Sequence, residues 1–113
     1  MEAPGFRKAI AADAPTLVLF TASWCPFCVR FDPVWQELAP GFGGPTLVAP
    51  LEEDADPRWD EFRIEVVPTV AVFRNGVPVA RLDGVLRRGI LRGDLERFLK
   101  ALPPPARSHT GAF

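Results

Sequence analysis

The chain has 113 residues, of which 48% are hydrophobic, and this length and composition favour one domain with a buried core over a disordered chain. Its net charge of −1 argues against nucleic acid or an anionic membrane as a partner. No apolar run approaches the roughly 18 residues of a membrane span, and residues 1–13 lack the apolar segment of a secretory signal. We expect a cytoplasmic protein that acts as a monomer, with no nucleic-acid or membrane partner.

The first predicted elements are a helix, a strand and a second helix. Residues 6–12 have the apolar spacing of a short helix that ends before Pro15. Residues 16–21 form a continuous apolar run, which indicates a central strand covered on both faces. The next helix is expected to open at Cys25, and Pro33 in its interior should kink it.

A second strand and an acidic loop are predicted in the middle of the chain. Residues 46–51 are mostly apolar, which indicates a second buried strand. The acidic residues 52–56 follow as a loop. Pro57 is expected to start a short helix that runs to about residue 63, with Trp59 serving in packing and not in binding.

A hairpin and a closing helix complete the domain. Residues 66–73 and 77–82 are predicted strands joined by Asn75-Gly76, a strong hairpin signal, and Pro78 indicates that the second lies at a sheet edge. Apolar residues at helical spacing predict the last helix between Leu91 and Leu102.

The order of these elements predicts an α/β fold. Alternating strands and helices followed by a hairpin indicate a central mixed β-sheet of about four strands flanked by helices, in three layers, α/β/α. We expect one domain over residues 1–102. Residues 103–113 are proline-led and polar, which predicts a flexible C-terminal tail.

The chain contains only two cysteines, Cys25 and Cys28, and they are three residues apart. Residues at this spacing share one face of a helix, with Cβ atoms about 5–6 Å apart. A disulfide needs Cα atoms about 4.4–6.8 Å apart, so the pair can exist as a dithiol or as a disulfide. Inert core thiols and half of a zinc site are the alternatives. The only histidine is His109, so one chain cannot supply four nitrogen or sulfur ligands, and we expect no metal.

Several short motifs lie in order along residues 16–102. They are the strand Leu17–Phe20, Ala22-Ser23-Trp24-Cys25 with Cys28, Pro33 in the following helix, Val67-Pro68-Thr69, Phe73 with Asn75-Gly76, and Gly84. Together these motifs resemble those of the thioredoxin family. The resemblance implies a thioredoxin fold and a protein-disulfide reductase, that is, a thiol-disulfide oxidoreductase that needs no cofactor.

The resemblance also implies roles for individual residues. Cys25 would be the nucleophile that attacks a substrate disulfide, and Cys28 would be the resolving cysteine. Pro68 would be preceded by a cis peptide bond, so that the Val67 backbone offers an edge for a substrate peptide. The expected rim of the substrate groove consists of Trp24, Pro26 and Phe27.

Three features of the chain depart from the thioredoxin pattern. Thioredoxins typically bury an aspartate six residues before the first cysteine, where this chain has Leu19, and the position of an accompanying lysine matches Pro50. The two residues between the cysteines are Pro-Phe, and a proline in the first slot is more like glutaredoxins or periplasmic oxidants. The Cys28 proton would then leave through water or a carboxylate such as Glu52 or Asp54, or resolution would be slower.

These departures leave the direction of electron transfer open. The first hypothesis is a cytoplasmic reductant of protein disulfides, recycled by a reductase or by a low-molecular-weight thiol. The second is a disulfide donor or isomerase with a more oxidising couple. The third is a thioredoxin-like binding module without catalysis.

Overall fold

The computed structural model describes residues 5–102, so the predicted tail at 103–113 lies outside the described residues. Four strands form one sheet in the order β2-β1-β3-β4, in which β1 is parallel to β2 and antiparallel to β3, and β3 is antiparallel to β4. The predicted mixed sheet of four strands is confirmed. The elements are α1 (Phe6–Ala11), β1 (Thr16–Thr21), α2 (Pro26–Leu38), a 3₁₀ turn (Ala39–Phe42), β2 (Thr46–Pro50), α3 (Arg58–Glu61), β3 (Thr69–Arg74), β4 (Val77–Asp83) and α4 (Arg92–Ala101).

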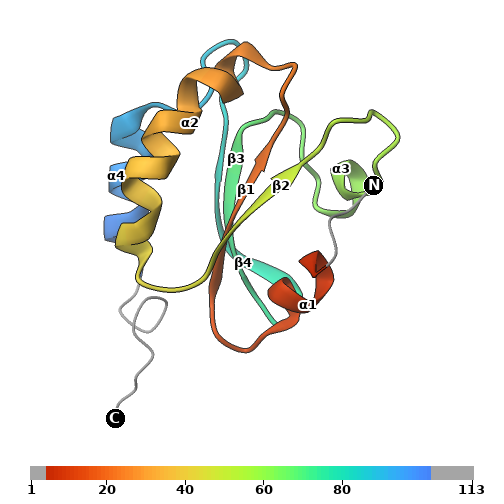
Figure 1. Ribbon diagram of the computed structural model, residues 1–113, viewed down its shortest axis with the longest axis vertical. Coiled ribbons are helices and arrows are strands. Elements are labelled where there is room, and N and C mark those ends of the chain that lie inside the picture. Colours follow the sequence, from red (N-terminus) through yellow and green to blue (C-terminus); the bar gives the residue numbers. More distant parts are fainter. Residues whose placement is uncertain (1–4, 103–113) are drawn as a thin grey trace.

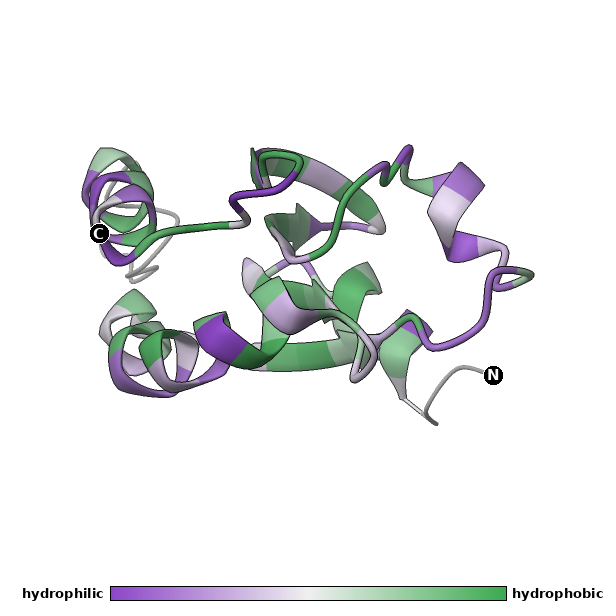
Figure 2. Cartoon of the chain, turned by 90° about the horizontal axis from the view of Figure 1, so that it is seen from above, coloured by the Kyte–Doolittle hydropathy of each residue, from purple (hydrophilic) through white to green (hydrophobic). Residues whose placement is uncertain are grey.

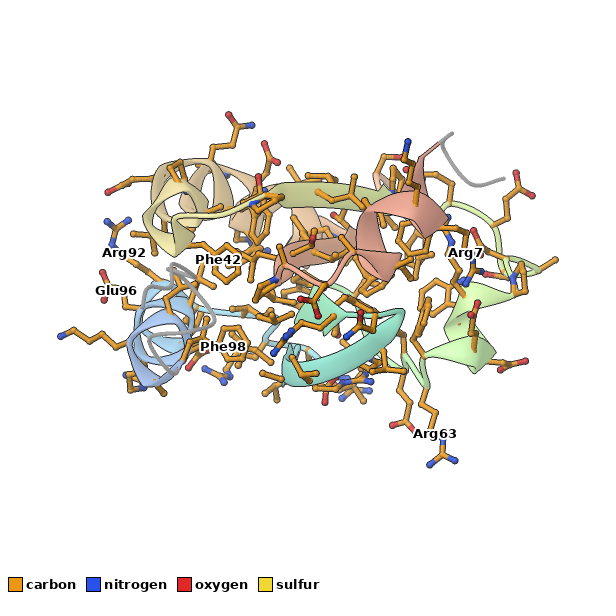
Figure 3. The ribbon with its side chains drawn as sticks, turned by 90° about the horizontal axis from the view of Figure 1, so that it is seen from below. Arg7, Phe42, Arg63, Arg92, Glu96 and Phe98 are labelled. Atoms are coloured by element: carbon orange, nitrogen blue, oxygen red, sulfur yellow. The ribbon has the colours of Figure 1, made fainter. Side chains whose placement is uncertain are left out.

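The helices lie on the two sides of this sheet, with α2 and α4 together on one side and α1 and α3 on the other (Figure 1). Hydrophobic residues run along the central strands between these layers, whereas much of the outer surface of the helices is hydrophilic (Figure 2). Exposed ion pairs join the helices of each side. Arg92 of α4 pairs with Glu37 of α2, and Arg7 of α1 pairs with Glu61 of α3. Arg92 and Arg7 lie at opposite ends of the view in Figure 3.

The central strand β1 supplies both halves of the core. Its side chains alternate between the two faces because successive residues of a strand point in opposite directions. Leu17 and Leu19 pack in the cluster that contains Phe31 of α2 and Leu95 of α4, whereas Phe20 packs in the cluster on the α1 side. The prediction of a strand covered on both faces is confirmed.

The second strand is not buried as predicted. Among the described residues β2 pairs only with β1, so it lies at an edge of the sheet. Val48 is 44% exposed and only Ala49 of this strand is buried. An apolar run indicates a strand, but its position in the sheet depends on which distant segments pair with it.

Two further boundaries differ from the prediction. The helix α3 ends at Glu61, shorter than the expected run to about residue 63, and Arg63 adopts a left-handed conformation with φ of 52°. The strand β3 begins only at Thr69. The Asn75-Gly76 turn is as predicted, with both residues at positive φ, and β4 lies at an edge as Pro78 indicated.

None of the helices within residues 5–102 combines the length and apolar character needed to cross a membrane.

Candidate active site

Cys25 lies immediately before α2 and caps its N-terminus. The Cys25 sulfur accepts a hydrogen bond from the backbone N–H of Cys28 at 3.4 Å. Pro26 occupies the first helical position, where its missing N–H removes no hydrogen bond. The N-terminal end of a helix favours a negatively charged group, so the local geometry suits a sulfur that must react as a thiolate.

The segment before β3 lies against the same sulfur. The Cys25 thiol donates a hydrogen bond to the carbonyl oxygen of Val67 at 3.5 Å. The peptide bond between Val67 and Pro68 is cis, as the motif resemblance implies. Gly84 at the end of β4 comes so close to Pro68 that a Cβ on it would lie 2.3 Å from the Pro68 carbonyl oxygen.

Cys28 is one helical turn further along α2. Both cysteines are free thiols and both are buried. Burial raises the pKa of the Cys28 thiol to about 11, while hydrogen bonds from Thr21 and the Ala22 backbone oppose this shift and the neighbouring Cys25 adds to it. The first thiol thus lies at the helix terminus, and the second lies one turn further along α2, where burial opposes the loss of its proton.

A groove of about 300 Å³ opens at Cys25. The predicted groove residues Trp24, Pro26, Phe27 and Val67 all line it, whereas Pro68 does not. The groove is also lined by Trp59, Glu65, Val66, Leu86 and Arg87. Trp24 is 55% exposed and Leu86 is 71% exposed, and exposed apolar side chains around a groove are typical of a binding surface.

Trp59, which the sequence predicts to serve in packing and not in binding, also lines this groove. Its ring stacks on Trp24 with centroids 6.4 Å apart. The two indole N–H groups bind consecutive backbone carbonyls of the acidic loop, Trp24 that of Glu52 and Trp59 that of Glu53. No local signal indicated this pairing, because it depends on how the acidic loop returns to the residues before α2.

The acidic loop is also tied to the cysteine-bearing segment through a side chain. The Glu52 carboxylate accepts hydrogen bonds from the backbone N–H and the hydroxyl of Ser23, the latter at 2.8 Å. Leu19, at the position where the family typically has an aspartate, is buried in the cluster that contains Phe31 and Trp35. The acidic loop therefore brings a carboxylate to the cysteine-bearing segment, whereas β1 has an apolar side chain at the position of Leu19.

A thioredoxin-like sheet with a dithiol at the start of α2 defines the class of the protein, and the comparisons with known proteins agree. The family model described as Thioredoxin matches residues 1–97. A thioredoxin of Alicyclobacillus acidocaldarius is 35% identical over 96 residues, which cover 84% of this chain and 91% of that protein. The chain belongs to the thioredoxin family and is a thiol-disulfide oxidoreductase; members of this family act as protein-disulfide reductases.

Two other similar proteins add detail. A bifunctional thioredoxin reductase/thioredoxin of Mycobacterium leprae is 34% identical over 95 residues, which cover 83% of this chain and 21% of that protein. The crystal structure of thioredoxin f2 of Chlamydomonas reinhardtii superposes with a TM-score of 0.69 at 19% identity, covering 85% of this chain and 87% of that one. At this low identity, the similarity to the Chlamydomonas reinhardtii structure supports the fold alone.

Proposed function

We propose that the protein reduces disulfides of other proteins, with Cys25 as the nucleophile and Cys28 as the resolving cysteine. The position of the Cys25 sulfur, at the N-terminus of α2 and on the groove, carries this proposal. The Cys25 thiolate attacks one sulfur of a substrate disulfide and the other sulfur leaves as a thiolate, which takes up a proton. Cys28 then loses its proton and attacks Cys25, so the substrate leaves reduced and the pair becomes a disulfide.

The groove supports extended segments of protein as the substrate. Trp24, Trp59 and Leu86 give it apolar walls, and the backbone of Val67 lies beside the reactive sulfur. An extended peptide can pair its main chain with such an edge while its side chains contact the walls. Trp24, Pro26, Phe27 and Val67, which line the groove, are therefore proposed as the substrate-binding part of the site, and Pro68, which does not line it, is proposed to belong to that part as the residue that follows Val67.

A reducing role requires an electron donor and a reducing compartment. We propose recycling by a thioredoxin reductase, with a low-molecular-weight thiol as the alternative donor. The name of the Mycobacterium leprae relative, which joins a thioredoxin reductase to a thioredoxin, supports the first. A cytoplasmic location agrees with this role because the cytosol keeps thiols reduced. The proposal takes the working unit to be a monomer.

The roles of the two cysteines can be tested with two variants of the same kind. Cys28→Ser should stop at the mixed disulfide and accumulate a covalent complex with a protein substrate such as insulin, whereas Cys25→Ser should form none. Non-reducing electrophoresis followed by mass spectrometry would identify the linked residues. A complex that forms through Cys28 in the Cys25→Ser variant would reverse the proposed roles.

The direction of electron transfer can be tested through the reduction potential of the Cys25–Cys28 couple. Equilibration with thiol buffers should give a value at or below roughly −250 mV, the range of cytosolic reductants. A value near or above roughly −180 mV would make the protein an oxidant or isomerase. A pair without a reversible two-electron transition would contradict a redox role altogether.

A further inference from the structure

A second hollow, separate from the groove, reaches Cys28. Its volume is about 260 Å³, and it shares no lining residue with the groove at Cys25. Its polar walls come from three parts of the chain: Thr21 at the end of β1, Ser23 with Glu52 from the two adjoining loops, and Asp32 of α2. The described residues therefore give each cysteine its own opening.

Cys28 needs such an opening because it must lose a proton to react. Burial raises the pKa of the Cys28 thiol to about 11, so only about 10⁻⁴ of it is thiolate at pH 7. The thiolate is the attacking species. The interior of β1 offers no base, since the residues from Leu17 to Phe20 are apolar.

Thr21 is the polar group that contacts the Cys28 sulfur from β1. A hydrogen bond from the Thr21 hydroxyl lowers the pKa of the Cys28 thiol. Such a bond strengthens as the sulfur gains negative charge, because hydrogen bonds to an ionised acceptor are about twice as strong as neutral ones. A hydroxyl at this point therefore stabilises the thiolate more than the thiol.

Two carboxylates, Asp32 and Glu52, line the hollow together with Cys28. Asp32 is four residues after Cys28 on α2, so the two side chains share one helical face. Glu52 is held at the other wall by its hydrogen bonds to Ser23. Cys25 is thus the titratable group that contacts the Cys28 sulfur, and Asp32 and Glu52 are the two carboxylates that line the same hollow as Cys28.

We propose that the Cys28 proton leaves through this hollow, with the Thr21 hydroxyl donating a hydrogen bond to the developing thiolate and with Asp32 and Glu52 receiving the proton. This inference rests on the proposed function and concerns its second step. In that step the Cys28 S–H bond breaks and the proton passes to a carboxylate. The Cys28 sulfur bonds to that of Cys25, and the substrate sulfur leaves with the electron pair of the broken mixed disulfide.

The two steps can be observed separately with 5,5′-dithiobis(2-nitrobenzoate) as the disulfide. Attack by Cys25 releases one coloured thiolate, and attack by Cys28 releases the second. In stopped-flow measurements with the full chain, Thr21→Val should leave the first phase within about twofold and slow the second about tenfold. The pH profile of the second phase should move to higher pH. Thr21→Ser keeps the hydroxyl, so the rate and the pH profile of its second phase should match those of the unmodified protein.

The carboxylates are tested with the double variant Asp32→Asn and Glu52→Gln, whose side chains are close in size to the originals. Its second phase should slow several-fold and should recover when imidazole is added as an external base, whereas its first phase should not change. Thr46→Val, a matched change on exposed β2, should alter neither phase. If Thr21→Val does not fold, the comparison of the double variant with Thr46→Val still tests whether the proton uses the hollow.

The outcomes distinguish the inference from the proposed function. If neither the Thr21→Val variant nor the double variant changes the rate or pH profile of the second phase, the proton does not use this hollow and the inference is wrong. If the unmodified protein releases no second thiolate, the proposed function itself fails. If both phases slow together in Thr21→Val but not in Thr46→Val, Thr21 acts on the whole site and the assigned role is wrong.

Discussion

Replacing Arg58 with methionine is expected to lower the free energy of unfolding by about 3–5 kcal/mol, because it leaves a buried carboxylate without its partner. Both side chains of the Arg58–Asp56 pair are only 1% exposed. The guanidinium donates from Nε and Nη2 to the two Asp56 carboxylate oxygens, at 3.0 and 2.7 Å. This two-bond geometry is the strong form of an arginine–carboxylate interaction.

Arg58 also connects the acidic loop to the rest of the core. It donates to the Pro50 carbonyl oxygen at 3.0 Å, and its guanidinium lies 4.9 Å from the ring centre of Phe6. Because Trp59 is the next residue, loss of the pair should also disturb the groove. We therefore expect Arg58→Met to weaken binding of protein substrates.

An exposed pair supplies the matched control. Arg74 and Asp13 form an ion pair in which the side chains are 45% and 83% exposed. Arg74→Met should lower the free energy of unfolding by less than about 1 kcal/mol, since water and salt screen such exposed pairs. Urea unfolding of both variants at pH 7 measures the difference. If both variants lose the same unfolding free energy, the buried Arg58–Asp56 pair stabilises the protein no more than the exposed pair does.

The same pair predicts a pH dependence. The hydrogen bonds from Arg58 hold the pKa of Asp56 at about 2, below its ordinary value of 3.8. A lowered carboxyl pKa stabilises the folded state above the ordinary value, and this contribution disappears as the pH falls through about 2. The gap in stability between the unmodified protein and Arg58→Met should therefore narrow by about 2 kcal/mol between pH 5 and pH 2. If the difference in unfolding free energy between the two proteins does not change with pH, Asp56 is not held ionised by Arg58.

Gly84→Ala is expected to reduce the turnover of protein disulfides by about 10- to 100-fold. An added Cβ would lie 2.3 Å from the carbonyl oxygen of Pro68, and a backbone atom cannot move aside as the tip of a flexible side chain can. The segment before β3 would have to shift, and with it the Val67 carbonyl that contacts the Cys25 sulfur. Displacing groups beside a reacting atom lowers rates steeply. The steric conflict should also cost about 1–3 kcal/mol of stability.

The control for this change is Gly41→Ala. A Cβ on Gly41 meets no atom within 4 Å, so the variant should keep its stability and its activity. Insulin reduction and thermal unfolding of the two variants give the comparison. Full activity in Gly84→Ala would show that the segment before β3 does not need its present position for turnover.

Local patterns in the sequence predicted most of the elements. The apolar run of β1, the helical spacing in α1, α2 and α4, and the Asn75-Gly76 turn all depend on residues close together in the chain. The cysteine pair and its helix terminus are local in the same sense. Their short range is the reason why they could be interpreted without knowledge of the fold.

The position of each element in the sheet required the tertiary structure. The sequence of β2 resembles that of a buried strand, yet β2 lies at an edge, because burial depends on pairing with segments far away. The acidic stretch was expected to be a loop with charged side chains, and the structure buries Asp56 of that stretch with Arg58. Charge composition alone does not reveal which charged residue finds a partner.

The sequence by itself determined the order of the elements, the spacing of the two cysteines and the turn that joins β3 to β4, since spacing and backbone preference act within a few residues, while the thioredoxin fold class was implied by the family resemblance of its motifs. Only the tertiary structure decided which residues surround each cysteine. It brought Trp59 onto Trp24 beside Cys25, and Thr21 to the hollow at Cys28. These contacts join residues up to 35 positions apart in the chain, and they exist because the sheet and the acidic loop fold back onto the start of α2.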